Sequence, residues 1–241
     1  MSSAPNDLPF QRASQDLEAA AEMILLDQQA CIKPGQESLS APRAGSLASN
    51  KPSAQLLPLP ALKTSVVGVS GRPQAGKDVF ADYMLATYAG VTKINFSDPI
   101  IDEVNSWLLP QQRQITAANK SRPACRKLLQ AWGRARRNEN EQHWVDTIKG
   151  RVLSALQDYS LVIVAGVRAL SDLELIEALG GVCIRVERPD NPYSAEDAIE
   201  TALDDQVGRM LILQNPQQGN LTAYHGNIEA LLSGPLSSAT N

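Results

Sequence analysis

Two glycines and a lysine at fixed spacing are the residues of this chain whose chemistry is easiest to recognise. Gly71 is followed by four residues and then by Gly76 and Lys77. Glycines let a loop curl so that successive backbone N–H groups point at phosphate oxygens. A lysine at the end of such a loop can place its ammonium over the outer phosphates. The spacing therefore predicts a nucleoside triphosphate site with these loop residues: Gly71, Arg72, Pro73, Gln74, Ala75, Gly76, Lys77, Asp78 and Val79.

The sequence on either side of the loop fits that prediction. The apolar run 66–69 indicates a buried strand before the loop, and residues 79–85 have helical periodicity after it. A helix that begins near Gly76 adds the positive end of its dipole to the phosphate site. The alternative is an ordinary strand–turn–helix with a surface lysine, which the combined spacing and context disfavour.

Asp78 stands where the usual pattern has serine or threonine, whose hydroxyl binds Mg²⁺. A carboxylate can serve a hard cation directly or through a bound water. Asp78 is therefore a candidate Mg²⁺ ligand, and a degraded loop with weak nucleotide binding is the alternative.

Two further charged residues follow predicted strands and are candidates for the same site. Arg168 comes directly after the apolar run 161–165, and Asp98 follows the predicted strand 91–96. An arginine at the carboxyl edge of a parallel sheet can bind a phosphate with two hydrogen bonds. Asp98 could bind a metal ion, orient the acceptor, or only cap the helix that begins at this point.

A basic run extends from Arg122 to Arg137. Arginines stabilise the charge of a phosphoryl group in transfer, and Arg126 is the preferred candidate because it shares a helix with Leu128, Leu129 and Trp132. Most of the other basic residues fit a solvated face equally well. The run could instead contact a nucleic-acid backbone.

Composition and charge exclude several classes of protein. The hydrophobic content is 43%, the charged content 20% and the formal net charge −4, which argues against a protein that coats nucleic acid. Three scattered cysteines indicate reduced thiols in an intracellular protein. No apolar run approaches the roughly 20 residues of a membrane span, and the N-terminus lacks the features of a secretory signal.

The composition also divides the chain into three parts. Residues 1–62 are rich in proline, serine and alanine and predict a flexible extension with one optional helix at 14–29. Residues 63–233 are expected to form the folded domain, and residues 234–241 a frayed tail.

Strand and helix patterns alternate within the folded domain. The predicted strands are 65–70, 91–96, 161–165, 182–186 and 210–213, and a polar loop is expected at 110–122. The predicted helices are 76–88, 99–109, 123–137, 141–156, 171–179, 195–205 and 227–232. This alternation predicts an α/β fold with a parallel sheet flanked by helices and ligands at the carboxyl ends of the strands. The glycine loop between the first strand and the first helix indicates the P-loop NTPase type of this fold.

Several motifs, in order, resemble those of bacteriophage deoxynucleoside monophosphate kinases. Gly-Arg-Pro-Gln-Ala-Gly-Lys-Asp-Val-Phe-Ala-Asp-Tyr at 71–83 is similar to that family's loop and first helix, which also carry aspartate after the loop lysine. Arg-Lys-Leu-Leu-Gln-Ala-Trp-Gly at 126–133 is similar to its Arg-Arg-Leu-Leu-Gln-x-x-Gly helix. Residues 161–189 resemble its "Asp-x-Arg … Glu … Gly-Gly … Arg-Pro" region, and shorter matches occur at 144–145 and 200–204. The resemblance covers about residues 64–233.

The resemblance implies a nucleoside monophosphate kinase-like enzyme that transfers the γ-phosphoryl group of ATP, with Mg²⁺, to a deoxynucleotide acceptor. Lys77, Arg126 and Arg168 are the catalytic residues it implies, and Asp78, with Asp98 as a second candidate, would serve the metal. The expected partner is a deoxynucleotide, with a homodimer left open, and the expected location is the cytoplasm, that of the host if a phage encodes the chain.

One mismatch keeps other functions open. Gly166 occupies the position of the family's acidic residue, whose role would have to move to Asp78, Asp98 or Asp172. Some phage kinases related to nucleotide kinases phosphorylate 5-hydroxymethyluracil within DNA during thymidine hypermodification, and this is the first alternative. A nucleotide-binding module without catalytic activity is the second.

Overall fold

The computed structural model describes residues 55–108, 115–116, 120, 123–191, 201–216 and 219–238. The optional helix at 14–29 and most of the expected loop at 110–122 lie outside them. The chain divides into two compact units, one with Leu56–Pro99 and Asn140–Asn241 and the other with Met1–Gln55 and Ile100–Glu139. We call them the sheet unit and the helical unit. Across the described residues, no helix combines the length and apolar character needed to cross a membrane.

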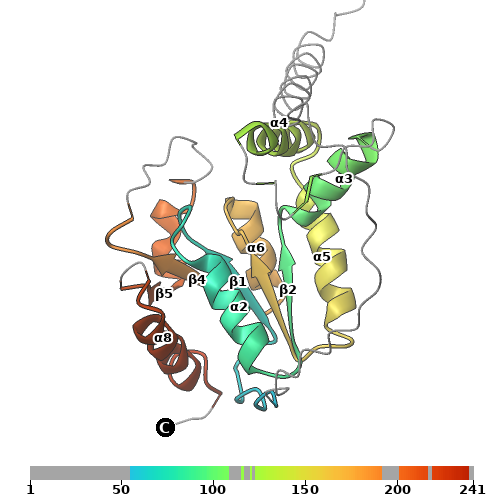
Figure 1. Cartoon of the computed structure of the whole chain (residues 1–241). Coiled ribbons are helices and arrows are strands. Elements are labelled where there is room, and N and C mark those ends of the chain that lie inside the picture. The colour runs from blue at the N-terminus through green and yellow to red at the C-terminus, as the bar shows by residue number, and fades with distance from the viewer. Residues whose placement is uncertain are drawn as a thin grey trace, which may run out of the picture. The chain divides into compact units, whose positions relative to one another are not determined.

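The sheet unit contains five parallel strands in the order β2-β3-β1-β4-β5 (Figure 1). The strands are β1 (Val66–Ser70), β2 (Val91–Asn95), β3 (Leu161–Ala165), β4 (Val182–Glu187) and β5 (Leu211–Gln214). All four pairings are parallel. The predicted α/β fold is confirmed, and each predicted strand lies within one residue of its observed bounds.

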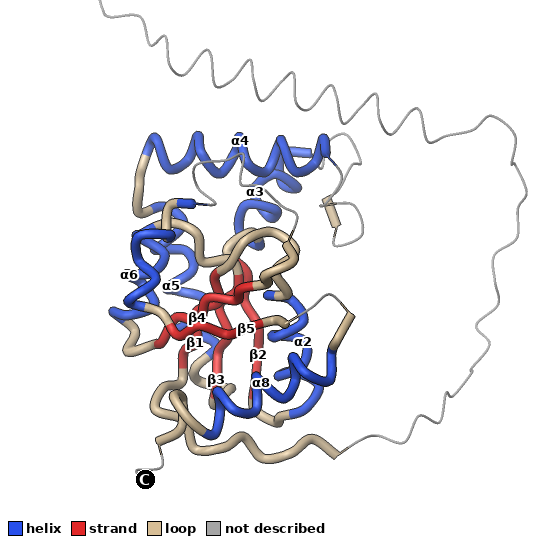
Figure 2. Tube along the Cα trace, turned by 90° about the vertical axis from the view of Figure 1, so that its left-hand side faces the viewer, coloured by secondary structure: helices blue, strands red, loops and turns tan. Residues whose placement is uncertain are grey.

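Helices cover both faces of this sheet, which Figure 2 shows from the side. α2 (Lys77–Thr87) and α8 (Leu221–Ser233) pack on one face against Val67 and Val69 of β1. α5 (His143–Ala155) and α6 (Leu170–Ala178) pack on the other face, where Val66 of β1 is buried. Because β1 is buried on both faces, its sequence is continuously apolar rather than alternating.

The parallel arrangement brings the expected site residues to one edge of the sheet. The phosphate-loop candidate follows β1, and the turn with Arg168 follows the neighbouring strand β3. In a parallel sheet the carboxyl ends of all strands meet at the same edge, where ligands bind in folds of this type. The β-strand register therefore places both segments on the ligand side of the sheet.

One predicted helix is described only at its C-terminal end. The prediction placed a helix at 195–205, and residues 195–200 lie outside the described residues. Thr201 is helical, a turn follows, and residues 204 and 205 belong to a 3₁₀-helix, η2 (Asp204–Arg209), so the α-helix ends earlier than predicted. Leu203 is buried at this point, and the next side chain, that of Asp204, pairs with two arginines.

Two segments near the C-terminus also differ from the expectation. α8 begins at Leu221 rather than 227, because the Asn220 side chain accepts a hydrogen bond from Ala223 N (3.2 Å) and caps the helix. Residues 234–238, expected to fray, pair with the segment before β1. Leu236 is buried, its carbonyl accepts a hydrogen bond from Lys63 N (2.9 Å), and Ser238 N donates to Ala61 O (2.9 Å).

The helical unit contains most of α3 (Asp98–Leu108) and all of α4 (Pro123–Glu139). Its small core is formed by Val104, Ile115, Cys125 and Leu128. Glu103 joins the two helices, since its Oε2 accepts hydrogen bonds from Trp132 Nε1 and Arg136 Nε, both at 2.9 Å. The basic residues of α4 therefore lie on a helix that is anchored by packing and by one carboxylate.

Gly68 lets α6 approach β1 closely, and a substitution there tests this packing. A Cβ atom at Gly68 would lie 2.8 Å from Ile176 Cγ1. We expect Gly68→Ala to lower the free energy of unfolding by about 1–3 kcal/mol because the core has no room for the methyl group. Urea unfolding measures the loss.

The control is a double-mutant cycle with Ile176→Ala, which removes the atoms that the new methyl group would meet. We expect the double variant to lose less stability than the sum of the two single variants, by more than about 0.5 kcal/mol. Strict additivity would contradict the close approach of α6 to β1.

Candidate active site

The loop between β1 and α2 has the backbone conformation that its glycines predict. Gly71 has φ 135° and Gly76 has φ 107°, both in the left-handed region that favours glycine. A Cβ atom at Gly71 would lie only 2.5 Å from Val186 O of β4. Glycine is therefore required at position 71 both by its φ angle and by the close approach of the neighbouring strand.

Side chains from outside the loop bind four successive carbonyl groups. Asn191 Nδ2 donates to Pro73 O (2.9 Å) and Arg188 Nη1 to Gln74 O (2.7 Å). Asn215 Nδ2 donates to Ala75 O (2.8 Å) and Tyr224 OH to Gly76 O (3.1 Å). These donors come from the segments that follow β4 and β5 and from α8.

The orientation of these carbonyls determines where the N–H groups of the loop point. A trans peptide is planar, so the N–H of each residue points opposite to the carbonyl of the residue before it. With the carbonyls of Pro73, Ala75 and Gly76 turned outward to side chains, the N–H groups that follow them face the inside of the loop. Ala75 N closes the turn on Arg72 O (3.2 Å). The result is a concave surface of N–H groups of the kind that binds phosphate.

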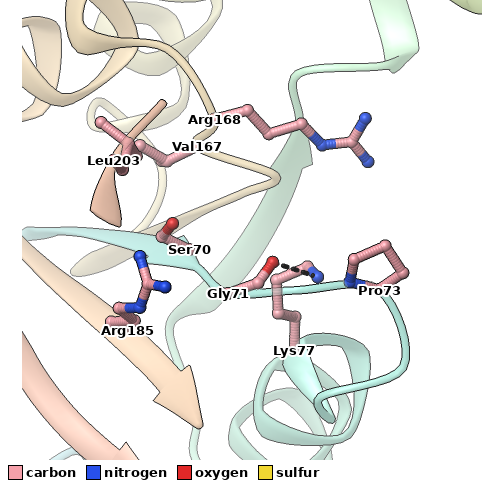
Figure 3. Close-up of a pocket in the computed structure, with 8 residues that line it drawn as sticks. All are labelled: Ser70, Gly71, Pro73, Lys77, Val167, Arg168, Arg185 and Leu203. Carbon is pink, nitrogen blue, oxygen red and sulfur yellow. Dashed lines mark hydrogen bonds between the residues drawn. The ribbon is translucent and has the colours of Figure 1, made fainter. Parts of the chain in front are cut away.

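The Lys77 side chain bonds back to the first two residues of the loop. Its Nζ donates to Gly71 O and to Arg72 O, each at 2.7 Å, and Figure 3 shows the first of these bonds. A small pocket of about 20 Å³ is left beside it. The lining comes from the end of β1, the loop and the start of α2, from the turn after β3, from β4 and from the residue before η2: Ser70, Gly71, Pro73, Lys77, Val167, Arg168, Arg185 and Leu203.

Arg168 lines the pocket from a turn whose backbone is fixed by Asp172. The Asp172 carboxylate is fully buried and accepts hydrogen bonds from the N–H groups of Arg168 and Ala169, both at 3.0 Å. Gly166, just before this turn, has φ 86°, which disfavours the acidic residue that the resembled family carries there. Asp172 therefore fixes the backbone of the turn that carries Arg168. Because its carboxylate is buried and already accepts these hydrogen bonds, a metal-binding role for Asp172 is disfavoured.

The two candidate metal ligands lie in different surroundings. Asp78 is exposed, and its Oδ1 is 2.7 Å from Lys93 Nζ. Asp98 accepts hydrogen bonds from Asn95 N (2.9 Å) and Asn95 Nδ2 (3.0 Å), which braces the turn before α3. No group of three or more histidines, cysteines or carboxylates occurs among the described residues in an arrangement that could hold a metal ion. Mg²⁺ in this site would depend on phosphate oxygens and water for most of its ligands.

Arg126 belongs to α4 in the helical unit, whereas every residue that lines the small pocket belongs to the sheet unit. Its proposed contact with an acceptor phosphate therefore stays a prediction. The structure brings together the loop residues, Lys77 and Arg168 at one edge of the sheet.

The sequence analysis missed other residues of this site. Arg185 lines the pocket from β4, and Asp204 binds both Arg185 and Arg72. Arg185 had a detectable signal, because it is the one charged residue in the predicted strand 182–186. Asn215 and Tyr224 gave none, since their role depends on the path of the chain around the loop.

Comparison with protein-family models and with curated proteins gives no match for this chain. Among solved structures, this chain is similar to dephospho-CoA kinase from Campylobacter jejuni, with 14% identity and a TM-score of 0.41. The match covers 71% of this chain and 97% of the dephospho-CoA kinase. This chain is also similar to shikimate kinase from Bacteroides thetaiotaomicron (11% identity, TM-score 0.39, 70% and 96% covered). Thymidylate kinase from Ehrlichia chaffeensis has 13% identity and a TM-score of 0.35, with 69% and 97% covered. At identities and TM-scores this low, activity and substrate are inferred only from this chain's own residues.

Tyr224 connects the stability of the protein to the loop, and its ionisation provides a test. Burial raises the pKa of the Tyr224 phenol, so the folded state favours the neutral form that donates to Gly76 O. The stabilisation from this shift is fully present below pH ~10, the unfolded value, and is lost as the pH rises above it.

We expect Tyr224→Phe to lower the free energy of unfolding at pH 7 by about 1 kcal/mol and to flatten its decline above pH ~10. Urea unfolding at several pH values measures both effects. Tyr159→Phe is the matched control for the pH 7 measurement, because Tyr159 is exposed and its removal should leave the free energy of unfolding unchanged. An unchanged alkaline slope in Tyr224→Phe would contradict the assigned role.

Proposed function

We propose that this protein is an ATP-dependent kinase that transfers the γ-phosphoryl group to a deoxynucleotide-type acceptor, with a deoxynucleoside monophosphate as the preferred one. The observation that carries the proposal is the loop between β1 and α2, where Lys77 donates to Gly71 O and Arg72 O beside a pocket that Arg168 also lines. Each part suits the phosphates of a nucleotide. The loop residues thus fit ATP.

Phosphoryl transfer depends mainly on position and on charge neutralisation. Bound ATP with Mg²⁺ supplies the group that is transferred: a bond forms from the acceptor oxygen to the γ-phosphorus, the β–γ bridging bond breaks, and ADP leaves with the electron pair. The loop N–H groups hold the phosphates. Lys77 exchanges its two backbone carbonyls for phosphate oxygens, and Arg168 neutralises charge on the equatorial oxygens.

The lining of the pocket favours a monophosphate acceptor. A phosphate acceptor is already an anion, whereas a hydroxymethyl acceptor must lose a proton to a general base. The pocket residues include three cations, Lys77, Arg168 and Arg185, and none of the described lining residues is a carboxylate or an imidazole. This set suits an anionic acceptor that needs no base.

For the metal, Asp78 is the proposed ligand, directly or through water, because it directly follows Lys77 at the start of α2. Its pairing with Lys93 would have to yield to the cation. Asp98 is the second candidate, which is weaker because it already accepts hydrogen bonds from Asn95.

A kinase that acts on 5-hydroxymethyluracil within DNA is the second candidate function. The observation in its favour is α4, where five arginines or lysines stand against one glutamate. A basic helix of this kind can contact a phosphate backbone. The α4 arginine proposed for catalysis, Arg126, would then bind polymer phosphate rather than the phosphate of a free acceptor.

A transfer assay with γ-labelled ATP and Mg²⁺ tests the proposal. The acceptors are a panel of deoxynucleoside monophosphates and, in parallel, duplex DNA that contains 5-hydroxymethyluracil. We expect label on a free monophosphate, and a loss of at least about 100-fold in turnover for Lys77→Ala because a transition-state cation is removed.

Lys63→Ala is the matched control and should keep full activity. Lys63 is a lysine of the sheet unit whose Nζ donates to Pro235 O (3.4 Å), near the C-terminal end of the chain. Label on the DNA alone would transfer the proposal to the second candidate. Label on neither acceptor, with ATP still bound, would favour a nucleotide-binding module without catalytic activity.

A further inference from the structure

One carboxylate connects two arginines at the border of the phosphate loop. Asp204 Oδ2 is 3.0 Å from Nη2 of Arg72, the second residue of the loop, and Asp204 Oδ1 accepts a hydrogen bond from Arg185 Nη2. The three residues come from the loop, from β4 and from the start of η2. Asp204 therefore joins three segments that are far apart in the sequence.

Arg185 is the unusual member of this group because it is buried. Its residue is only 8% exposed, although it lines the small pocket together with Lys77. Its Nε atom is buried without a hydrogen-bond partner in the described part of the chain, and it is 3.5 Å from Glu187 Oε1, with which it forms an ion pair. Burying a charge is unfavourable unless it is paired and hydrogen-bonded, so the guanidinium is held at this position despite incomplete pairing.

We propose that Arg185 is an additional phosphate-binding residue of the pocket and that Asp204 is the positioning residue that holds Arg185 and Arg72 beside the loop. The proposal rests on the proposed kinase function. An arginine has five N–H donors, so the bond to Asp204 leaves others for phosphate oxygens. Because Asp204 fixes the cation before the nucleotide binds, no rearrangement is needed when phosphate charge arrives.

The competing explanation is that Asp204 only anchors η2. The 3₁₀-helix already has two other anchors. Leu203, directly before it, is 3% exposed in the core, and Arg209 at its far end pairs with Glu177 of α6, with Nε donating to Oε1 at 3.0 Å. The Glu177 ion pair is thus a matched control: it anchors the same element but does not touch the phosphate loop.

Whether Asp204→Asn strengthens or weakens phosphate binding distinguishes a positioning role of Asp204 from a simple effect of its negative charge. Asp204→Asn removes a negative charge near the phosphate site, and charge removal alone would strengthen the binding of an anion. If Asp204 instead positions the two arginines, the same substitution weakens binding. We expect the dissociation constants of MgATP and of tripolyphosphate to rise about tenfold, equivalent to about 1.4 kcal/mol, as measured by isothermal titration calorimetry.

Two further variants complete the experiment. Glu177→Gln removes the exposed ion pair with Arg209 and should leave both dissociation constants within about twofold of wild type, because surface ion pairs contribute little. Arg185→Lys, which keeps the charge but loses the planar set of donors, should weaken tripolyphosphate binding as well. Tripolyphosphate reports on the phosphate contacts alone, because it lacks the nucleoside.

Tighter or unchanged tripolyphosphate binding in Asp204→Asn would overturn the proposal, and so would equal weakening in Glu177→Gln. If Asp204→Asn weakened the binding of MgATP but not of tripolyphosphate, the proposal would also be overturned, because Asp204 would then affect contacts with the nucleoside rather than with the phosphates. These binding results do not depend on turnover. If wild type binds MgATP but transfers no phosphate to any acceptor, the proposed function fails while weaker binding in Asp204→Asn still supports the phosphate-binding assignment.

Discussion

The arrangement of the site depends on hydrogen bonds that hold the carbonyl groups of one loop from outside. Four donors, from Arg188, Asn191, Asn215 and Tyr224, bind successive carbonyls of the loop. Because each peptide is planar, the N–H groups that follow the carbonyls of Pro73, Ala75 and Gly76 face the inside, while Ala75 N closes the turn on Arg72 O. The loop thus has its phosphate-binding shape before any ligand binds. The glycine at 71 is the other requirement, since β4 approaches too closely for any side chain there.

Electrostatics is the second constraint on this edge of the sheet. Lys77, Arg168, Arg185 and Arg72 gather around the loop, where Asp204 pairs with Arg72 and Arg185, and Glu187 pairs with Arg185. Lys77 bonds to two backbone carbonyls that an incoming phosphate would replace. Several cations in a partly buried site favour anionic ligands. The carboxylate of Asp204 holds two of these cations in place in the absence of ligand.

Much of the fold could be predicted from the sequence because its physical causes are local. Parallel strands buried on both faces need apolar runs, such as Leu161–Ala165, and these were found within a residue. The loop was found from Gly71, Gly76 and Lys77, whose spacing is set by backbone geometry. The alternation of strands and helices predicted a parallel sheet but not the order of its strands. The observed sheet confirms the parallel class.

The missed features depend on contacts between distant residues. Arg72 pairs with Asp204 across 132 positions, and Asn215 bonds to Ala75 across 140. No local pattern marks such pairs, because the topology of the sheet decides which side chains meet. The C-terminal end of the predicted helix at 195–205 was misplaced at Asp204, which lies in a 3₁₀-helix and pairs with two arginines from other segments. The buried charge of Arg185 in an apolar strand was visible in the sequence, but its partner was not.

The most direct test is a crystal structure of the protein with Mg²⁺ and a non-hydrolysable ATP analogue. We expect the β- and γ-phosphate oxygens to accept hydrogen bonds from loop N–H groups between Gly71 and Lys77. Lys77 Nζ should have left Gly71 O and Arg72 O for the phosphates, while the four outer donors keep their carbonyls. Phosphates bound elsewhere, or Lys77 still bonded to both carbonyls beside a bound nucleotide, would contradict the assignment of this loop as the phosphate site.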